Sequence, residues 1–88
     1  LEDDRFESIE EFKDCIGRGD EIEFEWKGVH FGMSGCQPKL EHRIMAYLWN
    51  QPDTEQYFDT PDDALEYIVA GDRLRDIITQ IDVLSRAF

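Results

Sequence analysis

Hydrophobic and acidic residues alternate strictly over residues 21–26, which read Glu-Ile-Glu-Phe-Glu-Trp. This two-residue period is typical of a β-strand with one buried face and one solvent-facing face. Lys27-Gly28 is a turn signal, and the alternation resumes with Val, Phe and Met over residues 29–33. The pattern therefore predicts a β-hairpin whose three glutamates share one face and whose apolar side chains share the other.

A helical pattern precedes this hairpin. The Ser-Ile-Glu-Glu sequence at residues 8–11 matches a capping box, in which the serine is the N-cap and the second glutamate reaches back toward the helix start. Ile9, Phe12 and Ile16 recur at helical spacing, and Gly17 is expected to end the helix.

The middle of the chain has weaker patterns. Residues 34–42 are expected to form an irregular connection, because they contain Gly35 and Pro38. A third strand, a turn and a short fourth strand are predicted at residues 43–49, 50–53 and 55–59.

Two helices are predicted to follow. Thr60-Pro61-Asp62-Asp63 is a helix start, with threonine as N-cap, proline at the first position and acidic residues in the first turn. This helix is expected to bury Leu65, Ile68 and Val69 and to end at Gly71. A final helix is predicted from about residue 73 into the low 80s by the i, i+3, i+4, i+7 spacing of its apolar residues, Leu74, Ile77, Ile78 and Ile81.

The predicted fold class is α+β. One N-terminal helix, a three- to four-stranded antiparallel sheet and two C-terminal helices on one face of that sheet would form a single compact acidic domain over residues 1–88. The start Leu1-Glu2, without methionine, is typical of a cloning scar, and residues 1–7 are expected to be frayed.

The charge of the chain indicates what kind of partner the protein binds. The chain has 21 Asp and Glu against 9 Lys and Arg, for a net charge of −12. The net charge is −8 over residues 1–25 and −6 over residues 51–88, whereas residues 26–50 carry +2. Such a field repels nucleic acid and anionic membrane and speeds encounter with a basic partner. We therefore expect a protein partner with a basic surface, and neither direct nucleic-acid binding nor membrane binding.

The sequence also argues against a membrane span, a signal peptide and enzymatic activity. No apolar run approaches 18 residues, and no basic segment precedes an apolar one, so neither a membrane span nor a signal peptide is expected. Two cysteines in an ordinary acidic domain favour a reducing cytoplasm. The chain has no nucleophile motif and no glycine-rich phosphate loop, so we expect no enzymatic activity and no catalytic residue.

Two acidic groups are candidate binding residues. Glu21, Glu23 and Glu25 would form a rigid row with a spacing of about 6.8 Å, on a scale similar to that of phosphates along a nucleic-acid strand. A second cluster on the predicted helix comprises Asp62, Asp63 and Glu66. The competing interpretation is that both groups are merely solvated faces that keep the protein soluble.

Three aromatic residues are further candidates. Tyr47, Trp49 and Tyr57 would form an exposed patch on the face opposite Ile44, Ala46 and Leu48. Exposed aromatic residues beside acidic rows would be binding hot spots, although aromatic residues at strand spacing are more often part of a core.

The chain's only cysteines and histidines, Cys15, His30, Cys36 and His42, all fall within 28 residues. Two thiolates and two imidazoles suit tetrahedral zinc, which would fix the 34–42 connection. Their spacing fits no standard zinc-finger pattern. The alternatives are a Cys15–Cys36 disulfide, or a core cysteine with surface histidines.

Three stretches carry a resemblance to known proteins. They read Gly-Asp-Glu-Ile-Glu-Phe-Glu-Trp-Lys-Gly at 19–28, Tyr-Phe-Asp-Thr-Pro-Asp-Asp-Ala-Leu-Glu-Tyr at 57–67 and Gly-Asp-Arg-Leu-Arg-Asp-Ile-Ile at 71–78. Over roughly residues 8–82 the chain resembles small acidic proteins of phages and mobile elements of Gram-positive bacteria. Its size, charge and element order are similar to those of several type II anti-CRISPR proteins.

The resemblance implies a non-enzymatic inhibitor that occupies a basic, nucleic-acid-binding surface of a type II CRISPR effector nuclease in the cytoplasm of the bacterial host, and so blocks nucleic-acid loading. The expected binding residues are the two acidic groups together with Tyr47 and Trp49. The alternatives are an antitoxin or immunity-type partner of a basic toxin, and a small zinc-stabilised structural phage protein.

Overall fold

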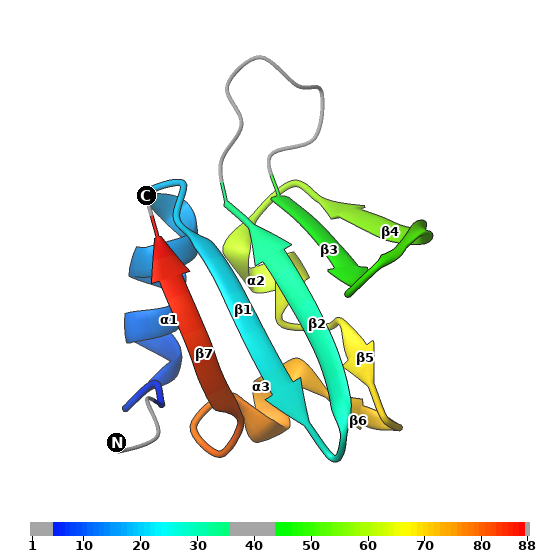
Figure 1. Cartoon of the computed structure of the whole chain (residues 1–88). Coiled ribbons are helices and arrows are strands. Elements are labelled where there is room, and N and C mark those ends of the chain that lie inside the picture. Colours follow the sequence, from blue (N-terminus) through cyan, green and yellow to red (C-terminus); the bar gives the residue numbers. More distant parts are fainter. Residues whose placement is uncertain (1–4, 36–43, 88) are drawn as a thin grey trace.

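The computed structural model, which describes residues 5–35 and 44–87, is an α+β fold built on a five-stranded antiparallel sheet (Figure 1). The strand order is β4-β3-β2-β1-β7, so the chain adds strands outward from β1 and then returns to β1 with its last strand. In chain order the elements are α1 (Ile9–Gly17), β1 (Glu21–Trp26), β2 (Val29–Ser34), β3 (Ile44–Leu48), β4 (Gln51–Phe58), α2 (Pro61–Ala64), β5 (Ile68–Val69), β6 (Asp72–Arg73), α3 (Leu74–Ile77) and β7 (Asp82–Ala87).

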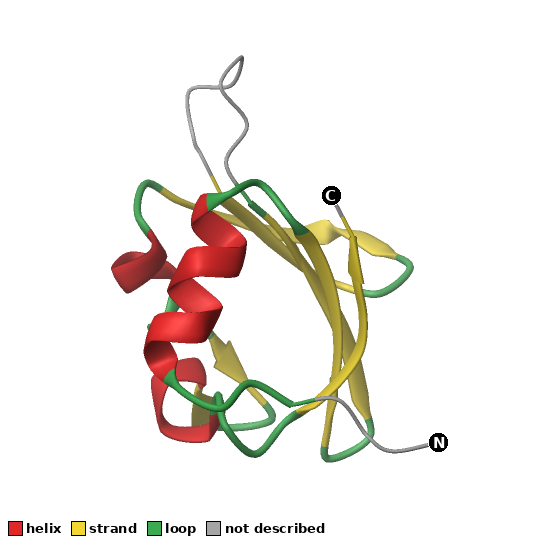
Figure 2. Ribbon diagram, turned by 90° about the vertical axis from the view of Figure 1, so that its left-hand side faces the viewer, coloured by secondary structure: helices red, strands yellow, loops and turns green. Residues whose placement is uncertain are grey.

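The three helices and the small β5–β6 hairpin lie on one face of the sheet, and no helix covers the other face in the described part of the chain (Figure 2). No helix within residues 5–35 and 44–87 is long and apolar enough to cross a membrane.

Helix α1 begins and ends as the sequence predicts. The hydroxyl of Ser8 accepts a hydrogen bond from the Glu11 backbone N–H at 3.1 Å, and Glu11 reaches back to accept one from the Glu7 N–H at 2.8 Å. These bonds pair donors at the helix start that have no partner within the helix. The helix buries Phe12 and Ile16 against the sheet.

The hairpin over residues 21–33 is confirmed. Strand β1 pairs with β2 from Glu21↔Ser34 to Trp26↔Val29. Lys27 and Gly28 make the two-residue turn, with positive φ values of 49° and 80°. Such a turn matches the right-handed twist of the strands it joins.

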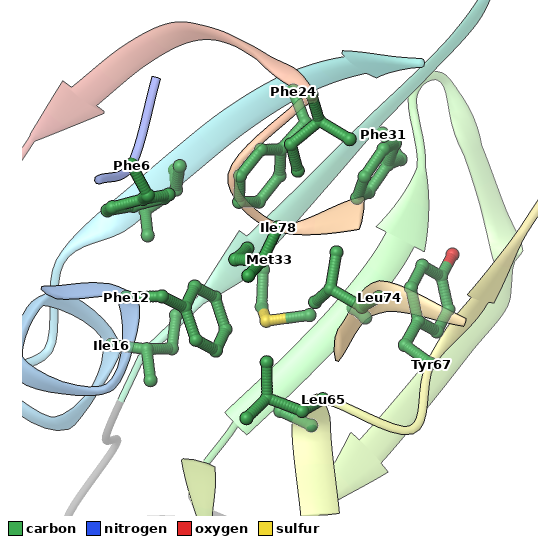
Figure 3. Packing of buried hydrophobic residues seen from close by; sticks show 14 of the residues in the cluster. Phe6, Phe12, Ile16, Phe24, Phe31, Met33, Leu65, Tyr67, Leu74 and Ile78 are labelled. Carbon is green, nitrogen blue, oxygen red and sulfur yellow. The ribbon is translucent and has the colours of Figure 1, made fainter. Parts of the chain in front are cut away.

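The core lies between the sheet and the helices (Figure 3). Phe24 and Phe31, on neighbouring strands, stack with ring centroids 4.9 Å apart. Phe6 meets Phe12 edge to face at 5.7 Å and is only 1% exposed. The prediction that residues 1–7 are frayed is therefore wrong for residues 5–7, because Phe6 is a core residue; residues 1–4 lie outside the described part.

The second hairpin turns earlier than predicted. Its turn residues are Trp49 and Asn50, the latter with a φ of 61°, and β4 already begins at Gln51, so the turn expected at 50–53 and the strand expected at 55–59 are wrong in their bounds. The Thr54 hydroxyl accepts a hydrogen bond from the Leu48 N–H and donates one to the Gln51 carbonyl. Residues 36–43 lie outside the described part. They include most of the predicted 34–42 connection and the predicted strand start at Arg43.

The C-terminal third differs most from the prediction. Thr60 caps α2 as expected, but this helix has only four residues. Ile68 and Val69 form a strand instead of a helix, and Ala70 and Gly71 turn the chain with φ values of 51° and 83°. Ile68 is 56% exposed, so its predicted burial is wrong.

Backbone hydrogen bonds explain why α2 is short. The carbonyls of Leu65 and Tyr67 accept from the N–H groups of Arg75 and Leu74, each at 2.8 Å. Carbonyls that would continue α2 thus pair with the start of α3, which itself is a single turn. The apolar residues predicted for the last helix are nonetheless all buried.

Strand β7 was not predicted. It pairs with β1 as the fifth strand, and the register shifts between Glu23 and Phe24, so that Leu84 is an extra residue opposite this step. The sheet therefore has one strand more than the expected three or four.

Candidate functional site

The uncovered face of the sheet, called the open face below, carries the glutamate row. Ile22 and Phe24 of β1 are buried toward the helices, whereas Glu21 and Glu25 are exposed and Glu23 is half-buried on the opposite side. The alternating burial thus confirms the predicted common orientation of the three glutamates. Figure 2 shows that none of the described helices covers this face of the sheet.

Among the described residues, the open face has almost no positive charge. Strands β1 to β4 contain neither lysine nor arginine, and His30 is their one residue that can become cationic. Arg86 of β7 belongs to the other side of the sheet, because its guanidinium lies 4.4 Å from the core ring of Phe6. Among the described residues neither Glu21 nor Glu25 has an ion-pair partner.

Strand register brings four residues into one row across this face. Glu23 lies opposite Ser85 of β7 on one side and opposite Gly32 of β2 on the other, and Gly32 lies opposite Tyr47 of β3. Directly opposed residues of an antiparallel pair point to the same face. The bulge at Leu84 sets which β7 side chain meets Glu23.

Gly32 lets Tyr47 lie across the sheet. A Cβ atom at residue 32 would be 2.7 Å from Cζ and from the hydroxyl of Tyr47, so the ring occupies the space above the glycine. Burial, and next the nearby carboxylates of Glu21 and Glu23, raise the pKa of the Tyr47 phenol. The phenol therefore stays neutral and lies close to both glutamates.

A second aromatic group lies beside Tyr47. The rings of His30 and Trp49 stack with their centroids 4.6 Å apart and an angle of 7° between their planes. The ring centroids of Tyr47 and Trp49 are 6.1 Å apart. His30 Nε2 is 2.9 Å from Glu23 Oε2. The angles do not suit a hydrogen bond between the two, so this contact is an ion pair only when the imidazole is protonated.

A hollow of about 70 Å³ lies beside Tyr47 on the open face. Its lining residues are Glu21, Ile22, Glu23, Tyr47, Trp49 and Ser85. A second hollow of about 260 Å³, also lined by Tyr47, lies at β3 and β4, and its lining residues include Met45, Leu48 and Pro52.

The other predicted aromatic residue also lies on this face. Tyr57 is opposite Met45, is 44% exposed and donates a hydrogen bond to Glu55 at 2.6 Å. Trp49 is 37% exposed. The open face thus combines exposed aromatic rings with carboxylates, the combination that suits binding of a basic protein surface.

The second acidic group lies elsewhere. Asp62 and Asp63 belong to α2, on the face that the helices cover, and Glu66 follows α2. Asp62 pairs with Lys13 at 3.0 Å, and Glu66 pairs with Arg75 at 2.6 Å and with Arg73 at 3.2 Å. The two predicted acidic groups therefore do not form one surface, and most of the second group already has basic partners.

The structure does not bring the described zinc candidates together. Cys15 is a free, buried thiol on α1, and its sulfur accepts from Arg18 and Arg86, whereas His30 lies on the open face across the sheet. Residues 5–35 and 44–87 hold no group of three or more metal-ligating side chains. Cys36 and His42 lie outside these ranges, so zinc binding stays a prediction for elemental analysis to test.

Comparisons with protein families, with curated proteins and with solved structures found no match to this chain. The resemblance to anti-CRISPR proteins therefore stays a prediction.

Sequence reasoning missed three contributors to this surface. Ser85 was missed because the predicted final helix ended in the low 80s and no strand was predicted after it. His30 was considered as a metal ligand or a surface residue but not as part of a binding face, although its alternation with Phe31 places it on the glutamate face. Gly32 carried a usable signal, because glycine inside a strand often marks a close approach by another group.

Proposed function

We propose that this protein is a non-enzymatic inhibitor that binds a basic, nucleic-acid-binding surface of a partner protein through the open face of its sheet. The observation that carries the proposal is the composition of that face: three glutamates in a row, aromatic rings beside them and no lysine or arginine on β1 to β4. Occupation of the partner's basic surface would block nucleic-acid loading.

Charge complementarity would drive binding of a basic partner to the open face. A net charge of −12 speeds encounter with a basic surface. Glu21 and Glu25 have no cationic partner among the described residues, so binding can supply partners without breaking existing ion pairs. The aromatic side chains would add buried apolar area at the centre of the interface.

The partner we propose is a type II CRISPR effector nuclease in the cytoplasm of a bacterial host, on the basis of the sequence resemblance alone. A basic toxin is the second candidate, since the same face would suit it. The identity of the partner separates these two functions, because the surface chemistry is common to both.

The test is a DNA-cleavage assay with a purified type II effector nuclease, its guide RNA and a target duplex. The protein should inhibit cleavage strongly when it is added before the guide RNA and weakly when it is added afterwards, because both compete for the same basic surface. Inhibition that is independent of the order of addition would contradict blocked loading, and an absence of inhibition would contradict this partner.

A further inference from the structure

The hollow beside Tyr47 has a chemistry more specific than a negative surface. Two of its lining residues are carboxylates, Glu21 and Glu23, and two are aromatic, Tyr47 and Trp49. Aromatic rings attract cations by their electron-rich faces, and carboxylates attract them by charge. Every strong feature of the lining therefore favours a positively charged occupant.

The carboxylates retain unused acceptor capacity. Glu21 has no ion-pair partner among the described residues, and Glu23 meets only His30, without the geometry of a hydrogen bond. A carboxylate can accept about four hydrogen bonds. Both carboxylates lie near enough to the Tyr47 phenol to raise its pKa further, which places them around the same small space.

The size of the hollow limits its occupant. At about 70 Å³ it is well below the roughly 300–1,000 Å³ of typical small-molecule sites. It has room for the head group of one side chain. A guanidinium fits this lining better than an ammonium does, because it is planar, carries five donors, pairs with carboxylates at two points and stacks on aromatic rings.

We propose that this hollow is a recognition pocket for one arginine side chain of the basic partner. The guanidinium would pair with Glu21 and Glu23 and pack against Tyr47 and Trp49, with the Ser85 hydroxyl at the far wall. This inference rests on the proposed function for its biological meaning, but the pocket itself can be tested without the partner.

The probe is N-acetyl-arginine amide, titrated into ¹⁵N-labelled protein, with N-acetyl-lysine amide as the comparison. The indole N–H signal of Trp49 should shift and saturate with the arginine probe. The indole N–H of Trp26 is an internal control, because it donates to Asp72 at 2.9 Å, away from the pocket. The lysine probe should bind at least about threefold more weakly than the arginine probe.

Two variants sharpen the test. Glu21→Gln with Glu23→Gln should abolish the saturable shift at Trp49. Glu10→Gln with Asp14→Asn removes the same charge from exposed residues of α1 and should leave the shift unchanged. No saturable shift, equal binding of the two probes, or equal loss in both variants would overturn the pocket.

The outcome separates this inference from the proposed function. If the arginine probe binds but the partner does not depend on the open face, the proposed function fails and the pocket stands. If the partner depends on the open face but the probe fails to shift Trp49, the pocket is wrong and the proposed function stands.

Discussion

Replacement of Gly35 by alanine should destabilise this protein far more than the same replacement at Gly32. A Cβ atom at Gly35 would overlap the carbonyl oxygen of Ile16 and lie 2.8 Å from the Cα of Gly19, both of them backbone atoms at the end of α1. At Gly32 the added Cβ would meet only the far end of the Tyr47 side chain, which can rotate away.

The magnitudes follow from these contacts. Overpacking against immobile atoms costs about 1–3 kcal/mol. The Gly35 N–H also donates to the Asp20 carbonyl at 2.9 Å, and loss of such a bond costs about 0.5–1.5 kcal/mol. We therefore expect Gly35→Ala to lower the free energy of unfolding by about 2–4 kcal/mol, and Gly32→Ala to change it by less than about 1 kcal/mol.

Urea unfolding followed by tryptophan fluorescence measures both variants against the wild type. A loss of about 2–4 kcal/mol corresponds to a fall in Tm of roughly 10–25 °C for a domain of this size. Wild-type stability of the Gly35→Ala protein would refute the close approach of β2 to the end of α1. Equal destabilisation by the two variants would refute the assignment of Tyr47 as the group above Gly32.

Three further predictions follow from other parts of the molecule. The Lys27 ammonium and the Trp26 indole N–H lower the pKa of Asp72. The stabilisation that these contacts give is therefore present above the ordinary pKa of about 4 and is lost as the pH falls through the lowered value. Asp72→Asn should destabilise the protein at neutral pH, and urea melts should show that the difference from the wild type shrinks in acid. Phe6→Ala should cost about 3–5 kcal/mol in the same melts, because Phe6 is a core residue, whereas a loss below about 0.5 kcal/mol would mean that the segment is frayed. The protein should bind neither DNA nor RNA in a gel-shift assay at moderate salt, and micromolar binding to either would contradict this expectation.

Local signals explain which elements could be predicted from the sequence. The hairpin over β1 and β2 is specified by strict alternation and by a Lys-Gly turn, and α1 by its capping residues and apolar spacing. Both depend on residues close together in the chain, and so does the orientation of Glu21, Glu23 and Glu25.

Long-range pairing explains what the sequence did not predict. Ile77, Ile78 and Ile81 have helical spacing and are buried, yet the helix covers only residues 74–77 and residues 82–87 form strand β7. Strand β7 pairs with β1 across some sixty residues, and its bulge breaks the alternation. In residues 74–81 apolar spacing thus predicted burial correctly but not conformation, whereas at Ile68 it predicted neither, and Ser85 of the pocket could not be found.

The central claim is that the open face, rather than negative charge in general, binds the partner. Two variants of equal net charge test it. The face variant carries Glu21→Lys, Glu23→Lys and Glu25→Lys on β1. The helix-side variant carries Glu7→Lys, Glu10→Lys and Asp14→Lys at exposed residues just before and on α1. Urea melts of both variants exclude differences that come from unfolding.

The decisive measurement is the affinity of each protein for a purified, guide-free type II effector nuclease, with and without competing guide RNA. The face variant should bind at least about tenfold more weakly than the helix-side variant, and guide RNA should displace the wild-type protein. Equal losses in the two variants would show that only net charge matters, and unchanged binding by the face variant would contradict the open face as the binding surface.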